Sequence, residues 1–267
     1  MKHIKPKKRW GQHFLKDKNI AQKIVNQLQF KENNAQLLEI GPGTGVLTDL
    51  LFEKYSKLTV VEIDEEAIDF LKKRYDSTTP IHIIQGDFLE MDLHRLLQGN
   101  WSIIGNFPYN ISSQIFFKLL EQKNQIQEIV CMLQREVAQR IASPPGNKDY
   151  GILSVLLQAY FTIDYIFTVN ENAFHPAPKV KSGVIRLTRN ERKELSCDEK
   201  LFFRLVKQAF QTRRKILKNA LKPLIPPIEA MKDDRLIKRA EQLGVDDFIE
   251  LTKKAETFLK FLPSVNL

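Results

Sequence analysis

Four short apolar segments, rich in β-branched residues, recur at nearly constant spacing in the first half of the chain. They lie at Leu37–Ile40, Leu58–Ile63, Ile81–Ile84 and Trp101–Ile104, and their starts are 21, 23 and 20 residues apart. Helix-like patterns, "VLTDLLFEKY" and "EAIDFLKKRY", fill the first two gaps. Strands that alternate with helices at this spacing predict right-handed βαβ units and a parallel sheet. The predicted fold class is therefore α/β.

The second half continues this pattern and then departs from it. "QEIVCML" predicts a fifth strand, "YGILSVLLQAYF" a helix, and "IDYIFTV" with "SGVIRLT" a late antiparallel pair. After Thr188 a charged connector leads into helical patterns at 201–221, 235–243 and 246–261. We therefore expect one domain over residues 1–190 and a small helical domain over 191–267. The apolar window 150–169 is interrupted by polar residues, which favours a buried helix and strand over a membrane span.

The net charge suggests a binding partner, and the two cysteines suggest a cellular compartment. Lys and Arg number 41 against 32 Asp and Glu, a net charge of +9, which favours a polyanion such as nucleic acid; a basic solvated surface is the alternative. Cys131 and Cys197 suggest no disulfide framework, so we expect a reducing, intracellular compartment. The opening "MKHIKPKKRW" lacks the apolar core of a secretory signal. The five histidines show no metal-ligand spacing, so no metal is expected.

A glycine-rich turn follows the first predicted strand. "LLEIGPGTGVLT" places Gly41, Gly43 and Gly45 between that strand and its helix. Glycines allow a ligand to approach the backbone closely at this point, although a plain tight turn has the same composition. The spacing lacks the last glycine of the dinucleotide fingerprint, and no P-loop lysine follows.

Polar residues mark the ends of the next three strands, namely Glu62, Asp87 and Asn106. Open parallel sheets bind ligands at this edge. Glu62 can accept both hydroxyls of a ribose, and Asp87 can accept from the exocyclic amine of an adenine. Each carboxylate alone is equally consistent with a solvated surface acid, but together they indicate a nucleoside cofactor. Without a pyrophosphate cradle, the favoured cofactor is S-adenosylmethionine.

The segment "GNFPYNIS" follows the fourth strand. The Asn106 side chain and the Phe107 or Pro108 backbone offer carbonyl oxygens that can accept both hydrogens of an adenine amine. Such contacts turn the lone pair of the nitrogen toward a sulfonium methyl group. Tyr109 would stack on the flipped base. A simple turn with a core aromatic is the alternative.

Taken in order along the chain, these motifs resemble the KsgA (RsmA) family, which dimethylates two adjacent adenosines near the 3′ end of small-subunit ribosomal RNA. The segments that carry the resemblance are "KKRWGQHFLKD", "LEIGPGTGVLT", "VEID", "GDFLEMD", "GNFPYNIS", "LQREVAQRI", "FHPAPKVKSGVIRL" and "FQTRRKILKNAL". Two positions depart from it: Phe107 stands where Leu or Ile is usual, and Lys181 where an acid often precedes the serine.

The resemblance implies a Rossmann-like, S-adenosylmethionine-dependent methyltransferase domain with a small all-helical C-terminal domain. It implies that Asn106, Pro108, Tyr109 and Phe174 act at the target base, Phe174 as its second aromatic. The residues implied for the cofactor are His13, Leu15, Gly41, Gly43, Glu62, Asp87 and Asn106.

The same resemblance identifies a basic segment as the RNA contact. Lys200–Lys222 holds eight basic and no acidic residues, which favours phosphate contacts over a solvated face. A continuous helix would place six of these residues on one face. The RNA-binding residues expected here are Arg213, Arg214, Lys215 and Lys218. The basic N-terminal run Lys5–Arg9 is either a second contact or a frayed terminus.

The expected protein is a monomeric, cytoplasmic enzyme that acts on small-subunit ribosomal RNA in a pre-ribosomal particle, with no membrane partner. Two rival functions stay open. One is the related methylation of large-subunit RNA that confers macrolide resistance. The other is an assembly or transcription factor whose catalysis is vestigial.

Overall fold

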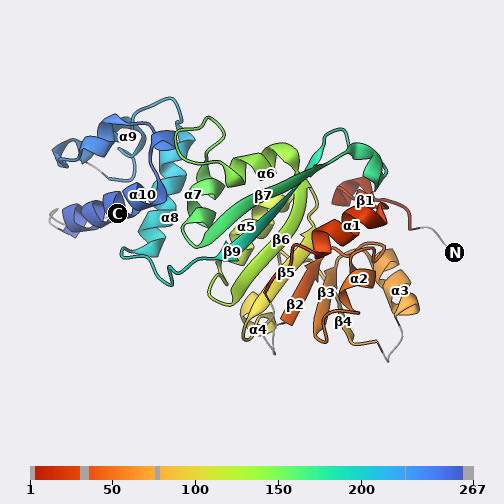
Figure 1. Cartoon of the computed structure of the whole chain (residues 1–267). Coiled ribbons are helices and arrows are strands. Elements are labelled where there is room, and N and C mark those ends of the chain that lie inside the picture. The colour runs from red at the N-terminus through yellow and green to blue at the C-terminus, as the bar shows by residue number, and fades with distance from the viewer. Residues whose placement is uncertain (1–3, 31–35, 76–78, 226, 261–267) are drawn as a thin grey trace. The chain divides into compact units, whose positions relative to one another are not determined.

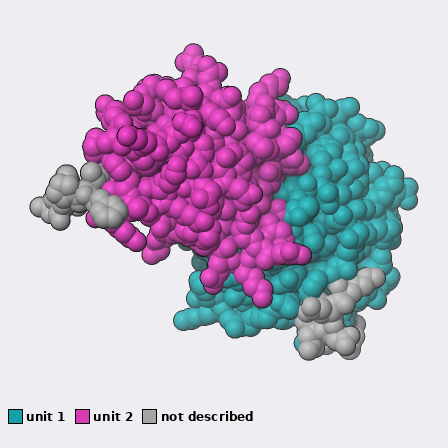
Figure 2. Space-filling view, turned by 60° about the vertical axis from the view of Figure 1, so that its left-hand side comes forward, with its two compact units in different colours: residues 1–139, 162–189 teal, residues 140–161, 190–267 magenta. Residues whose placement is uncertain are grey.

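The computed structural model describes residues 4–30, 36–75, 79–225 and 227–260. It divides into two compact units, coloured teal and magenta in Figure 2. Unit 1 comprises residues 1–139 and 162–189, and unit 2 comprises residues 140–161 and 190–267.

The sequence predicted a single domain over residues 1–190, and the structure differs in the segment 140–161. This segment groups with unit 2 because it is bound there. The Gly146 N–H donates to the Glu241 carbonyl at 2.7 Å, and helix α7 (Ile152–Gln158) contacts helix α8 (Glu199–Gln211).

The sheet of unit 1 has seven strands in the order β4-β3-β2-β5-β6-β9-β7 (Figure 1). Strands β2 to β6 run parallel, and β9 pairs antiparallel with β6. The five parallel strands predicted from the sequence are therefore confirmed, and the two late strands are neighbours at the other edge. The strands are β2 (Gln36–Ile40), β3 (Leu58–Glu62), β4 (Ile81–Gln85), β5 (Trp101–Asn106), β6 (Ile126–Gln134), β7 (Phe161–Val169) and β9 (Ser182–Arg189).

Helices follow the strands as the alternating pattern predicts, and Figure 1 shows α2 and α3 beside β3 and β4. Aspartates begin several of them: the Asp17, Asp64 and Asp92 side chains accept backbone N–H groups at the first turns of α1, α3 and α4. The helices are α1 (Lys18–Val25), α2 (Thr48–Leu51), α3 (Glu65–Arg74), α4 (Leu93–Leu96), α5 (Ser112–Leu120) and α6 (Arg135–Ala142), with 3₁₀ turns η1 (Lys8–Trp10) and η2 (Glu171–Ala173).

A second, two-stranded sheet pairs β1 (Phe14–Leu15) antiparallel with β8 (Phe174–His175). It joins the N-terminal segment to a loop that lies about 160 residues further along the chain in unit 1. The core beneath the main sheet contains fully buried residues from its central strands, including Leu37, Val60, Ile104 and Val130. The polar ends of these strands are therefore held on a rigid, apolar base.

Unit 2 is helical, with α7, α8, α9 (Leu217–Ala220), α10 (Val245–Lys260) and 3₁₀ turns η3 (Ile228–Ala230), η4 (Asp234–Ile237) and η5 (Ala240–Gln242). Two predicted helices are not continuous α-helices in the structure. The pattern at 201–221 breaks at Thr212, where α8 ends. The pattern at 235–243 forms two 3₁₀ turns, because Arg239 between them is extended and bridges Ile216.

Candidate functional site

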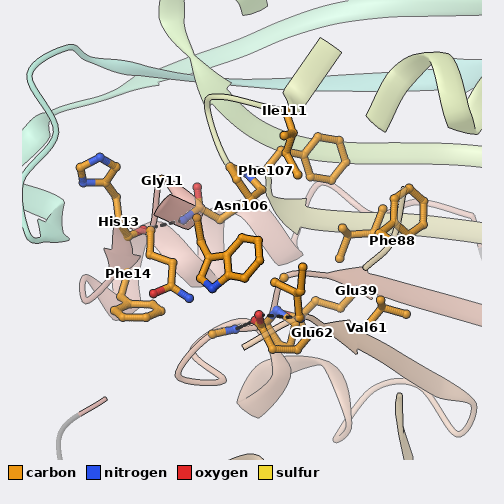
Figure 3. A pocket seen from close by; sticks show the side chains of 18 of the residues that line it. Gly11, His13, Phe14, Glu39, Val61, Glu62, Phe88, Asn106, Phe107 and Ile111 are labelled. Atoms are coloured by element: carbon orange, nitrogen blue, oxygen red, sulfur yellow. Dashed lines mark hydrogen bonds between the residues drawn. The ribbon is translucent and has the colours of Figure 1, made fainter. Parts of the chain in front are cut away.

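A cavity opens where strands β2, β3, β4 and β5 end, beside the short strand β1 (Figure 3). Parallel sheets collect the loops that follow their strands at one edge, so residues far apart in the sequence meet there. The predicted site residues that line this cavity are His13, Leu15, Gly41, Gly43, Glu62, Asp87, Asn106, Pro108 and Tyr109.

The turn after β2 needs glycine at two positions for different reasons. Gly41 and Gly43 have φ angles of +68° and +57°, a region that disfavours L side chains. A Cβ on Gly43 would lie 2.8 Å from a ring carbon of Phe14. Apart from Gly41 itself and its two chain neighbours, no described residue has an atom within 4 Å of the Cβ position at Gly41. Gly43 thus allows close packing, while Gly41 leaves open space that a ligand can fill.

The carboxylate of Glu62 ends β3 and is held by backbone donors. Its Oε2 accepts the Gly43 N–H at 3.1 Å, and its Oε1 accepts the N–H groups of Ile63 and Asp64, each at 2.9 Å. The residue is only 5% exposed, and burial raises the pKa of its carboxyl against these hydrogen bonds. These three bonds use three of the roughly four lone-pair sites of the carboxylate, so about one site, on Oε2, is left for a hydroxyl donor.

A second buried carboxyl, which the sequence patterns did not indicate as a site residue, also lines the cavity. Glu39 of β2 is 1% exposed, and its Oε2 accepts the Thr48 hydroxyl at 2.7 Å. Burial raises the pKa of Glu39 to about 8, so it holds a proton at neutral pH. An acid inside the apolar run "LLEIG" was the available signal for it.

Asp87 lies in the loop after β4, and its Oδ1 accepts the Leu89 N–H at 2.9 Å. This bond turns the carboxylate toward its own loop and leaves the second oxygen for another donor. Phe88, which is 5% exposed, and Leu89 supply apolar surface to the same part of the cavity. A carboxylate beside apolar side chains suits a flat heterocycle with an exocyclic amine.

Asn106 is the last residue of β5, and its side-chain amide has a defined orientation. The Nδ2 donates to the backbone carbonyl of His13 at 2.9 Å, a contact drawn in Figure 3. The Oδ1, on the other side of the amide, is therefore the acceptor that Asn106 can present to a ligand. Next to it, Phe107 is fully buried, and the Pro108 carbonyl accepts the Ile111 N–H at 3.2 Å, which closes the turn.

Tyr109 lines the cavity, and both ends of its side chain are fixed. Its hydroxyl lies 2.5 Å from the Ser182 hydroxyl, and its ring centroid lies 5.5 Å from that of His13. The His13 ring in turn contacts the Pro176 carbonyl through Nδ1, at 2.8 Å. Burial raises the pKa of the Tyr109 phenol, so the ring stays neutral. A fixed, neutral aromatic ring is suited to stack on a base.

Phe174 is the predicted base-contacting residue that the structure does not bring to this cavity. Its side chain is 2% exposed and belongs to the hydrophobic core. Successive side chains of a strand point to opposite faces, so β8 buries Phe174 and exposes His175. The sequence motif did not indicate on which face of the strand Phe174 lies. A direct contact of Phe174 with a base stays a prediction, and it requires the ring to leave the core.

The four predicted RNA-binding residues of unit 2 fall into two groups. Arg213 is engaged within the unit, where its guanidinium donates to the carbonyls of Lys148 and Tyr150. Arg214 and Lys215 are exposed, and Lys218 is half-buried. Because α8 ends before Arg213, the basic face predicted for one continuous helix does not form. The exposed members are better placed than Arg213 to meet a phosphate.

Two kinds of feature are absent from the described part of the chain. Over those ranges, no cluster of three or more His, Cys, Asp or Glu side chains could hold a metal ion. Among the helices described, none is long and apolar enough to cross a membrane.

Comparison with known proteins identifies the relatives of this chain. Residues 3–257 match the model of the family described as ribosomal RNA adenine dimethylase. A protein of Bacteroides thetaiotaomicron named ribosomal RNA small subunit methyltransferase A is 52% identical over 263 residues, which cover 97% of each chain. A protein of the same name from Cytophaga hutchinsonii is 52% identical, covering 94% of this chain and 98% of its own.

Solved structures give the same grouping. A dimethyladenosine transferase from Plasmodium falciparum has a TM-score of 0.77 at 26% identity, covering 91% of this chain and 98% of its own. The 23S rRNA methyltransferase ErmE has a TM-score of 0.66 at 24% identity, covering 90% of this chain and 99% of its own. The second likeness is one of fold alone.

Proposed function

The chain belongs to the ribosomal RNA adenine dimethylase family, and from this premise we propose that it methylates N6 of two adjacent adenosines near the 3′ end of small-subunit ribosomal RNA. It is an S-adenosylmethionine-dependent adenine methyltransferase with a Rossmann-like sheet, and the product is N6,N6-dimethyladenosine. The observation that supports this function best is the amide of the cavity-lining Asn106, whose nitrogen is bound to the His13 carbonyl and whose oxygen is left to accept a hydrogen bond.

The donor set at the strand ends suits S-adenosylmethionine. Glu62 offers the remaining lone pair of Oε2 to a ribose hydroxyl, and Asp87 offers Oδ2 to the adenine amine. The open space beside Gly41, in the cavity that His13 and Leu15 also line, is left for the methionine end. When bound, the cofactor supplies an electrophilic methyl group on a sulfonium.

The residues after β5 act on the target amine. Its nitrogen is a poor nucleophile because its lone pair is delocalised into the adenine ring. Asn106 Oδ1 accepts one N–H, and the Phe107 or Pro108 carbonyl accepts the other. These contacts favour a pyramidal nitrogen whose lone pair is free to attack. Tyr109 holds the base by stacking. The new N–C bond would form as the methyl C–S bond of the sulfonium breaks and leaves a thioether. The amine proton would then pass to water, so no base has to act first.

The alternatives are less well supported. The 52% identical relatives carry the name of the small-subunit enzyme, whereas the 24% identity to ErmE, the large-subunit type, extends to fold only. Vestigial catalysis does not suit a site in which Asn106, Glu62 and Asp87 are all present. An additional role in small-subunit assembly is compatible with activity.

The finer features of the function belong to the same proposal. We expect a monomer that works in the cytoplasm. We expect its substrate to be a pre-ribosomal particle, because a folded ribosomal RNA offers phosphates to unit 2 as well as an adenosine to unit 1. Structured RNA is recognised mainly by shape and phosphate contacts, with bases read where they are splayed out. Arg214, Lys215 and Lys218 are the proposed phosphate contacts.

Radiolabelled methyl transfer tests this function. The substrates are small subunits from cells that lack the modification, large-subunit RNA and a short single strand. We expect labelled N6,N6-dimethyladenosine from the small subunits alone. Equal labelling of large-subunit RNA, or no transfer to small subunits, would overturn the proposal.

A further inference from the structure

Asp64, two residues beyond the cofactor-binding Glu62, holds the N-terminal segment of the chain. Its side chain is fully buried, and its Oδ1 accepts the Lys7 ammonium at 2.5 Å and the Glu66 N–H at 3.1 Å. Its Oδ2 accepts the Gln12 amide at 2.9 Å. Burial by itself raises the pKa of Asp64, but the hydrogen bonds from Lys7 and Gln12 outweigh it and hold the pKa below its ordinary value. The carboxylate is therefore charged at neutral pH and satisfied by this segment.

Lys7 and Gln12 also bind each other. The Lys7 backbone N–H donates to the Gln12 Oε1 at 2.8 Å, so both ends of the Gln12 amide are used. The Lys7 ammonium has a second, exposed partner in Glu66 at 3.3 Å. These contacts hold Lys7 in place, so Lys7 does not belong to a frayed terminus. We call Lys7, Gln12 and Asp64 the latch.

Gln12 of the latch directly precedes His13, whose carbonyl oxygen orients the Asn106 amide. This carbonyl accepts the Asn106 Nδ2 at 2.9 Å. Figure 3 shows His13 and Glu62 at separate parts of the cavity wall, with Asn106 beside His13. Residues 7–16 therefore run from Asp64, just beyond the C-terminal end of β3, to the Asn106 amide at the C-terminal end of β5. On the far side, this run is fixed by the Lys16 N–H, which donates to the Ala173 carbonyl at 2.9 Å.

We infer that Asp64, Lys7 and Gln12 are positioning residues for methyl transfer: by fixing the segment before His13, they hold its carbonyl where it selects the reactive orientation of the Asn106 amide. This inference rests on the proposed function. An amide can turn by 180°, and the reversed form would present N–H groups to the target amine in place of an acceptor. The His13 carbonyl favours the productive form, because only then does Nδ2 have its acceptor.

A merely structural anchor would have a different consequence. If the latch only tied down the terminus, its loss would lower stability or cofactor affinity and leave the rate of the chemical step unchanged. If it positions the His13 carbonyl, its loss lowers that rate at saturation, because a displacement of about 1 Å at a reacting group can cost up to about 100-fold.

The test uses Gln12→Ala and Lys7→Met in the full chain, because Asp64 also caps α3 and its loss endangers folding. The matched controls are Gln22→Ala and Lys18→Met, which alter α1 away from the cavity. Single-turnover methyl transfer to small subunits is measured with cofactor and RNA saturating. Cofactor affinity is measured by calorimetry and melting temperature by differential scanning calorimetry.

We expect Gln12→Ala and Lys7→Met each to slow single turnover by at least about tenfold, with cofactor affinity within about threefold of the wild type. Lys7→Arg should restore the rate, since a guanidinium can also pair with Asp64, and the double variant should lose little more than either single one. Normal rates in both latch variants, or rate losses matched by losses of cofactor affinity, would overturn the inference. Failure of the wild type to methylate small subunits would instead overturn the proposed function.

Discussion

The hydroxyls of Tyr109 and Ser182 lie 2.5 Å apart, and Ser182 is fully buried at the start of β9. This contact links the loop after β5 to the antiparallel strand that pairs with β6. The orientation of the Tyr109 ring is therefore set by the fold before any base arrives. A preorganised ring loses little freedom when a base stacks on it.

Tyr109 should act through its ring more than through its hydroxyl. Stacking of a base on an aromatic side chain is worth about 1–3 kcal/mol, so Tyr109→Ala should lower kcat/KM for small subunits by about 5- to 150-fold. Tyr109→Phe keeps the ring and should stay within about tenfold of the wild type, losing one neutral hydrogen bond. Equal losses in the two variants would show that the hydroxyl, and not the stack, matters.

Glu62→Ala should weaken cofactor binding. Hydrogen bonds to a charged group contribute roughly 1.5–3 kcal/mol each, so the dissociation constant should rise at least about tenfold. Calorimetry with S-adenosylmethionine measures this, and Glu65→Ala, which removes an exposed acid from α3, is the control. Unchanged affinity in a folded Glu62→Ala protein would remove Glu62 from the site.

The pKa of Glu39 predicts a pH-dependent stability. In the folded protein this pKa is raised to about 8, so between about pH 4.5 and 8 the folded state binds a proton that the unfolded chain has released. The free energy of unfolding should therefore fall as pH rises through this window, by up to about 1.4 kcal/mol per pH unit from this group.

Glu39→Gln keeps an acceptor for Thr48 and cannot ionise. Denaturant unfolding of the wild type and this variant from pH 5 to 9 should show the variant gaining relative stability as pH rises. Parallel curves for the two proteins would contradict the buried, protonated state of Glu39.

Arg213 and Arg214, though adjacent, should behave differently. Arg213 donates to the Tyr150 carbonyl at 2.8 Å, so Arg213→Ala should lower the free energy of unfolding by roughly 1.5–3 kcal/mol. The double variant Arg214→Ala, Lys215→Ala should keep its stability. Its log–log salt slope for small-subunit binding should fall by about 0.7–0.9 for each RNA phosphate that the protein no longer neutralises. A stable Arg213→Ala protein with a reduced slope would reverse this assignment.

Local patterns in the sequence were sufficient to predict the main sheet and the edge of the sheet that carries the site. The β-branched runs set the strands, and Gly41, Glu62, Asp87 and Asn106 each lie at or just beyond a strand end. A parallel sheet brings such ends together whatever the details of the helices between them. This is why these four lining residues could be predicted before any tertiary contact was known.

Features that depend on distant contacts could not be predicted. The latch joins Asp64 to residues 52 and 57 positions earlier, and no local pattern pairs them. Phe174 is buried because β8 pairs with β1, again a distant partner. The break of α8 at Thr212 was missed because the helical pattern of apolar residues continues through it.

We propose that the Asn106 amide oxygen activates the target amine, and single-turnover methyl transfer by Asn106→Ala tests this role most directly. Small subunits lacking the modification and S-adenosylmethionine are both saturating, and Asn19→Ala, an exposed change on α1, is the control. Loss of one preorganised electrostatic partner should slow transfer by about 100-fold or more, while RNA affinity changes little. A rate close to that of the wild type would contradict the proposed role of Asn106.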